Sequence, residues 1–160
     1  MERKEYRFDF EVYNHVDELS TDDGALLQQA RATTANAYAP YSHFNVGAVA
    51  KLVNGAIVTG TNQENASYPV GICAERVLLS AAAVLHPNVP IDTLAISYHN
   101  LDGDSSKPVS PCGMCRQSLS EYQIRVGQPM RLILSGMDGK VYIIDKADEL
   151  LPFSFTPDDL

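Results

Sequence analysis

Two short cysteine motifs constrain the fold of this chain more than any other feature. Cys73-Ala74-Glu75 opens one predicted helix, and Pro111-Cys112-Gly113-Met114-Cys115 opens a later one. A chain with three cysteines cannot pair all of them, whereas a secreted disulfide-stapled domain usually carries an even number, so we expect reduced thiols. A C-x-x-C pair by itself fits a metal site, redox chemistry or a buried core, and the neighbouring residues must decide.

Zinc binding is the use of three thiols that we favour. A catalytic zinc site has three protein ligands in a tetrahedral arrangement and keeps the fourth position for water. Both motifs lie at predicted helix N-termini, where the positive end of the helix dipole stabilises thiolates. We therefore expect Cys73, Cys112 and Cys115 to hold one Zn²⁺ per chain. Three thiolates leave this centre negative, and Arg76 and Arg116 are the adjacent positive groups.

Glu75 is the predicted catalytic residue. It follows Cys73 by two positions, too close for both side chains to bind one ion without strain. Its carboxylate can instead face the water, take a proton from it, and pass protons to a ring nitrogen and a departing amine. A Cys or His ligand, a non-ligating Glu and a later P-C-x-x-C form the signature of zinc-dependent base deaminases.

Buried thiols and a structural zinc site are the competing interpretations. Packing alone gives no reason for a Glu beside a buried Cys at a helix start. A structural zinc site normally needs a fourth protein ligand. On one helix, His86 lies roughly 20 Å from Cys73, too far for a shared tetrahedron. The sequence alone does not exclude His15, His43 or His99 as the fourth ligand.

Strands alternate with helices along the chain, which predicts a layered α/β domain. The Asn54-Gly55 pair is typical of a tight hairpin turn. Alternation of Tyr6, Phe8, Phe10 and Val12 with charged residues can add an edge strand from the N-terminal arm, residues 1–19. The predicted helices are 21 to before Pro40, 74–85 and 113–125, and the predicted strands are 46–53, 56–61, 93–98, 131–135 and 141–145.

Composition excludes several classes of partner. The net charge is -8, which disfavours nucleic-acid binding because phosphate neutralisation needs clustered Lys and Arg. No apolar run approaches the roughly 20 residues that cross a bilayer, and the charged start is unlike a secretory signal. We expect a cytoplasmic protein with a single domain, residues 1–160, a small-molecule substrate, and no membrane or nucleic-acid partner.

The chain resembles the small cytidine deaminases of pyrimidine salvage from about Gln28 to Leu160. Besides the two cysteine motifs, with Arg76, Arg116 and Gln117, the resemblance rests on three segments: 39–48 (APYSHFNVGA), 60–68 (GTNQENASY) and 150–152 (LLP). It implies a three-layer α/β/α sandwich around a mixed five-stranded sheet, assembled as a homotetramer. Residues 69–71 (PVG) depart from the commoner pattern, in which Gly directly follows the Tyr.

The resemblance also implies roles for individual residues. Asn62 and Glu64 match the pair that hydrogen-bonds the ribose, and Phe44 matches an aromatic residue beside the cytosine ring. Ala74 would offer its backbone to the base. The remaining matches are Arg76 and Gln117, which lie near the thiolates in the family, and Phe155, an aromatic residue that a neighbouring subunit contributes to the pocket.

The sequence therefore predicts a zinc-dependent hydrolase that deaminates cytidine and 2′-deoxycytidine and releases ammonia. A carboxylate beside the sugar would repel a phosphate, which favours a free nucleoside. Two alternatives stay open: a deaminase of another cytosine-bearing small molecule, and a non-catalytic zinc-stabilised binding module. A substrate panel of cytosine compounds distinguishes them.

Overall fold

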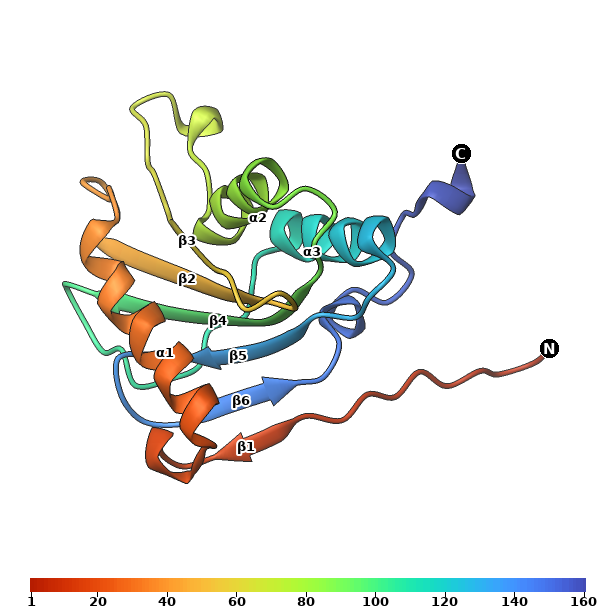
Figure 1. The fold of residues 1–160 in the computed structure, drawn as a ribbon, viewed down its shortest axis with the longest axis horizontal. Helices are drawn as coiled ribbons and strands as arrows, with labels where there is room; N and C mark the ends of the chain where they lie inside the picture. The colour runs from red at the N-terminus through yellow and green to blue at the C-terminus, as the bar shows by residue number, and fades with distance from the viewer.

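A computed structural model describes all 160 residues and contains one mixed six-stranded sheet (Figure 1). The order across the sheet is β1-β6-β5-β4-β2-β3. The strands are β1 (Glu11–Tyr13), β2 (Phe44–Leu52), β3 (Ile57–Thr61), β4 (Ile91–Asn100), β5 (Arg131–Ser135) and β6 (Val141–Ile144). Only β4 and β5 are parallel, and every other neighbouring pair is antiparallel.

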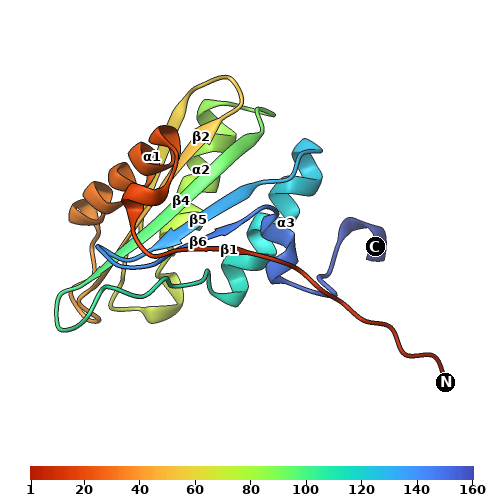
Figure 2. The same ribbon diagram turned by 90° about the horizontal axis from the view of Figure 1, so that it is seen from below.

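The prediction of a five-stranded sheet is wrong by one strand. The N-terminal arm supplies β1, which pairs antiparallel with β6 through Glu11 and Ile143, Val12 and Tyr142, and Tyr13 and Val141. An uncovered β6 would leave a row of backbone donors and acceptors at the sheet edge, and the arm pairs with it. The regular strand covers only three residues, and the residues before it run away from the sheet (Figures 1 and 2).

Three helices cover the two faces of the sheet, so the predicted three-layer α/β/α architecture is confirmed. They are α1 (Thr21–Thr33), α2 (Ala74–Leu85) and α3 (Gly113–Val126). Helix α1 covers one face, and α2 and α3 lie together on the other (Figure 2). Helix α3 lies in the crossover between the parallel strands β4 and β5, which no short turn could join.

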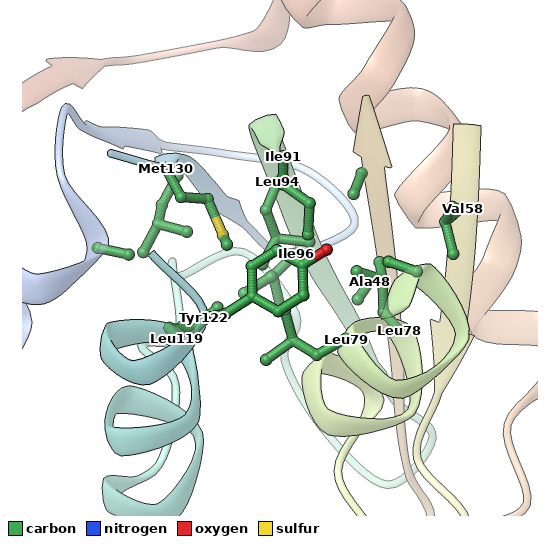
Figure 3. Packing of buried hydrophobic residues seen from close by; sticks show 14 of the residues in the cluster. Ala48, Val58, Leu78, Leu79, Ile91, Leu94, Ile96, Leu119, Tyr122 and Met130 are labelled. Atoms are coloured by element: carbon green, nitrogen blue, oxygen red, sulfur yellow. The ribbon is translucent and has the colours of Figure 1, made fainter. Parts of the chain in front are cut away.

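Each face of the sheet has its own hydrophobic core. The larger core joins strand residues to α2 and α3, with Leu78, Leu94 and Leu119 fully buried (Figure 3). The smaller core lies under α1 and includes Leu27, Val49 and Ile133. Each fully buried Leu or Ile contributes about 1.5–3 kcal/mol relative to an exposed one, so both faces are held firmly.

Two glycines let helices approach the sheet closely. A Cβ on Gly47 would lie 2.3 Å from the carbonyl oxygen of Ala30 in α1. A Cβ on Gly60 would lie 2.4 Å from the carbonyl oxygen of Ala74, in the first turn of α2. Gly60 therefore sets how closely the start of α2, which carries the first cysteine motif, lies against β3.

The predicted elements agree with the observed ones to within a few residues. Helix 74–85 and strand 131–135 have the predicted bounds, and β2 and β3 form the predicted hairpin around Asn54-Gly55. The N-cap of α1 is Ser20, whose side chain accepts a hydrogen bond from the backbone of Asp23. None of the helices combines the length and hydropathy needed to cross a bilayer.

Candidate active site

The three cysteine thiols converge where α2 and α3 begin side by side. Cys73 is the N-cap residue of α2, Cys112 is the N-cap residue of α3, and Cys115 lies in the first turn of α3. The Sγ atoms of Cys73 and Cys112 are 3.8 Å apart, and those of Cys112 and Cys115 are 3.5 Å apart. All three sulfur atoms lie within 4.8 Å of one another.

This donor set fits a zinc ion. Tetrahedral zinc with Zn–S bonds of about 2.3 Å places its sulfur ligands about 3.8 Å apart, close to the separations found here. No His, Asp or Glu joins the group. Three thiolate donors without a fourth protein ligand are the arrangement of a catalytic zinc site. Cys73, Cys112 and Cys115 would therefore hold one zinc ion and leave one position open.

The electrostatics of the cluster favour a cation. The pKa of the Cys73 thiol falls to about 6, chiefly because the Cys115 thiol donates a hydrogen bond to its sulfur. The same contact raises the pKa of the Cys115 thiol, which favours its protonated form. A divalent cation replaces such protons when it binds, and its charge stabilises all three thiolates.

Glu75 lies in the first turn of α2 and is 5% exposed. Burial raises the pKa of its carboxyl group. A carboxyl group whose pKa is raised toward neutrality accepts and returns protons more readily near neutral pH. Glu75 also lines the same cavity as Cys73 and Cys112, which places a proton carrier beside the candidate metal ligands.

The cavity has a volume of about 480 Å³, within the usual range of small-molecule sites. One wall is aromatic: the rings of Phe44 and Tyr98 stack with centroids 4.7 Å apart and planes 12° apart. Its lining includes the predicted site residues Phe44, Asn62, Glu64, Cys73, Ala74, Glu75 and Cys112. The fold thus brings most of the predicted site together.

Asn62 and Glu64 lie directly after β3, at the end of the cavity lined by Ser42. The Asn62 side chain accepts a hydrogen bond from the backbone of Val46 (2.7 Å) and donates one to the backbone oxygen of Phe44 (2.9 Å). Glu64 Oε2 accepts from the backbone of Tyr41 (2.8 Å) and of Ser42 (3.3 Å). The Ser42 hydroxyl group is the main cause of a lowered pKa of Glu64, and the two backbone hydrogen bonds lower it further, so Glu64 stays ionised.

Four predicted site residues are absent from the cavity lining: Cys115, Arg76, Gln117 and Phe155. Arg76 lines a separate groove between α2 and α3, together with Glu121 and Arg125. After the hydrogen bonds with Cys115 and Cys112, the charge of Arg76 also lowers the pKa of Cys73. Gln117 donates a hydrogen bond of 2.8 Å to the backbone oxygen of Phe155. Phe155 is 60% exposed.

Two contributors to the site were missed by the sequence reasoning. Arg116, noted there only as a charge, holds the second motif in place, because it donates to the backbone oxygens of Pro111 (2.8 Å) and Leu150 (3.0 Å). Tyr98 lines the cavity although the sequence predicts only a strand there. The available signal was alternation, since Leu94, Ile96 and Tyr98 share one face of β4.

A mixed sheet between helical layers, with three thiols at two helix N-termini and a buried carboxyl group beside a cavity, defines a zinc hydrolase of the deaminase class. Residues 20–127 match the sequence family described as the cytidine and deoxycytidylate deaminase zinc-binding region. The chain belongs to this family, and the resemblance seen in the sequence is confirmed.

Individual relatives agree with this assignment. The chain is 35% identical to the cytidine deaminase of Halalkalibacterium halodurans, over 87% of this chain and 98% of that protein. It is similar to the crystal structure of cytidine deaminase from Burkholderia pseudomallei, with a TM-score of 0.70 and 35% identity over 86% of this chain and 100% of that one. A blasticidin-S deaminase of Bacillus cereus is 29% identical over 86% of this chain and 95% of that protein.

Proposed function

We propose that this chain is a zinc-dependent enzyme that hydrolyses cytidine and 2′-deoxycytidine to uridine and 2′-deoxyuridine and releases ammonia. The observation that carries the proposal is the position of Glu75. Its side chain is buried, lines the same cavity as Cys73 and Cys112, and forms no salt bridge. Family membership and the cytidine deaminase relatives support the same reaction.

The chemistry requires a nucleophilic water and a group that moves protons. A zinc ion held by Cys73, Cys112 and Cys115 would act as a Lewis acid and lower the pKa of water toward neutral pH. Glu75 accepts a proton from the water that adds to C4 of the cytosine ring and delivers it to N3. It then moves the remaining hydroxyl proton to the 4-amino group, the C4–N bond breaks, and ammonia leaves.

The cavity lining supports a neutral nucleoside as substrate. In our proposal Phe44 lies against the base, the backbone of Ala74 contacts it, and Asn62 and Glu64 bind the ribose hydroxyls. The Asn62 side chain donates one hydrogen bond to the backbone of β2 and accepts one from it, which fixes its orientation. Its second amide hydrogen remains available for the sugar. The ionised Glu64 disfavours a phosphate group nearby.

We further propose a homotetramer that acts in pyrimidine salvage in the cytoplasm. Unpaired thiols are typical of reducing compartments, and all three cysteines are unpaired here. Exposed aromatic residues near the C-terminus, Phe153 and Phe155, are the surfaces that a partner subunit would cover. Near the thiolates, Arg76 and Gln117 would act by charge and by holding the Phe155 segment.

The experiment is a substrate panel with purified, zinc-loaded protein. Cytidine, deoxycytidine, cytosine, CMP and blasticidin S are supplied in turn, and the absorbance change and released ammonia are measured. We expect rapid conversion of the two nucleosides and slow conversion of CMP. Conversion of blasticidin S alone would favour a different cytosine-bearing substrate, and no ammonia from any compound would favour a non-catalytic zinc module.

A further inference from the structure

Tyr98 stacks on the aromatic wall of the cavity from the neighbouring strand. The register of β2 and β4 pairs Val46 with Tyr98 and Phe44 with Asn100, so Phe44 and Tyr98 are diagonal neighbours on one face of the sheet. Their ring centroids are 4.7 Å apart, and the ring planes differ by 12°. Both side chains line the cavity that also contains Glu75.

The two rings differ in burial. Tyr98 is 5% exposed, and on its face of β4 it follows Leu94 and Ile96, which belong to the larger core. Phe44 is the first residue of β2 and is less buried. The core therefore holds Tyr98 firmly, whereas Phe44 depends on its neighbours for a fixed ring orientation.

We propose that Tyr98 is a positioning residue of this site, whose ring stacks on Phe44 and fixes it as a flat wall for the base. This rests on the proposed function, since it assumes that a cytosine ring lies against Phe44. A wall that is already ordered loses less conformational entropy when the base binds, so the stack should improve affinity more than turnover.

Two substitutions test the ring. Tyr98→Phe keeps the stack, whereas Tyr98→Leu keeps an apolar side chain but removes the stack. Tyr122→Leu is the matched control, because Tyr122 is as deeply buried, 4% exposed, but lies on α3 in the larger core and does not line the cavity (Figure 3). Each variant is assayed for zinc content, thermal stability, and KM and kcat with cytidine.

The ring is tested by the split between KM and kcat. Tyr98→Leu should raise KM for cytidine roughly three- to tenfold, the loss expected for one aromatic pair, with a smaller change in kcat. The equilibrium Kd for cytidine should rise by the same factor in a Glu75→Gln background. Tyr98→Phe should restore KM to within about twofold of the wild type, since the ring is kept. Tyr122→Leu should lower thermal stability and leave KM unchanged.

Two results would overturn the role of the ring: an unchanged KM in Tyr98→Leu, or an equal rise of KM in Tyr122→Leu. A wild-type chain that neither binds nor deaminates cytidine would instead overturn the proposed function.

Discussion

In the proposed reaction Glu75 carries out every proton transfer. The Glu75→Gln variant keeps the size and burial of the side chain but cannot carry a proton. We expect kcat for cytidine to fall by at least about 10²-fold, the usual contribution of a positioned acid–base group, with zinc retained. Steady-state kinetics and metal analysis measure the two effects. Glu64→Gln is the comparison in the same cavity, and it should act mainly on KM.

Substantial residual turnover in Glu75→Gln would remove Glu75 from the proton-transfer role. Loss of zinc in that variant would instead make it a metal ligand, contrary to the arrangement of the three thiols without a carboxylate. The two outcomes are separated by measuring zinc content before the kinetics.

The thiols are the second residue-scale test. Cys112→Ser and Cys115→Ser should each lose bound zinc, because a serine hydroxyl is a poor zinc ligand near neutral pH. Cys115 is fully buried whereas Cys112 is exposed, so Cys115→Ser should also lower the melting temperature more. Met114→Ser is the control, since Met114 lies between the two cysteines and is 63% exposed. Full zinc occupancy in either cysteine variant would contradict the ligand assignment.

Some residue roles could be predicted from the sequence because they depend on local spacing. Cys73 and Glu75 share one helical turn, and Cys112 and Cys115 share another, so their mutual geometry is nearly fixed by the helix. Asn62 is different, because its hydrogen bonds run to the backbone of β2, and their partners depend on the strand register. Tyr98 could not be predicted for the same reason, since its stack on Phe44 exists only once β4 lies beside β2.

At the scale of elements, the contact between β3 and α2 determines the position of the first turn of α2, which carries part of the site. A Cβ at Gly60 would lie 2.4 Å from the carbonyl oxygen of Ala74 and 2.6 Å from the backbone nitrogen of Leu78. Backbone atoms cannot move aside as a flexible side chain can, so the first turn of α2 would have to shift. That turn carries Cys73 and Glu75 toward the cavity.

We therefore expect Gly60→Ala to destabilise the protein by about 1–3 kcal/mol, the usual cost of overpacking, and to weaken zinc binding and kcat together. Gly24→Ala is the control, because Gly24 lies in α1 and the nearest atom to a new Cβ is 3.8 Å away. That change should stabilise the helix by about 0.5–1 kcal/mol. Denaturant unfolding and zinc titration measure both variants, and a Gly60→Ala protein with normal zinc affinity would contradict the proposed contact.

The elements themselves were largely predictable because local signals agree with the fold. Helix α2 is rich in Ala and Leu and ends shortly before Pro87, and the Asn54-Gly55 turn fixes the hairpin of β2 and β3. The sixth strand was predicted only as an option for the arm. Its pairing with β6 joins residues at opposite ends of the sequence, and no local pattern specifies such a partner.

At the scale of the whole molecule, the C-terminal segment is the feature that a single chain does not explain. Phe153 is 100% exposed and Phe155 is 60% exposed, although both follow a segment that packs into the larger core through Leu150. Gln117 and Ser120 of α3 contact the backbone oxygen of Phe155 and the hydroxyl of Ser154, so the segment is attached to the helix that carries Cys115. Symmetric self-association is the usual way in which such apolar residues become buried.

The last prediction is that Phe155 completes the cavity of a partner subunit. Phe155→Ala should then raise KM for cytidine while zinc stays bound, because a ring stacked on the base contributes roughly 1–3 kcal/mol. Glu75→Gln chains are inactive but keep Phe155, and Phe155→Ala chains keep Glu75. When the two are mixed under conditions that exchange subunits, some sites should combine Glu75 of one chain with Phe155 of another. Those sites should recover the low KM, measured as a second kinetic component that grows with exchange. A fully active monomer at high dilution, or proven exchange without recovery, would show that each chain contains a complete site.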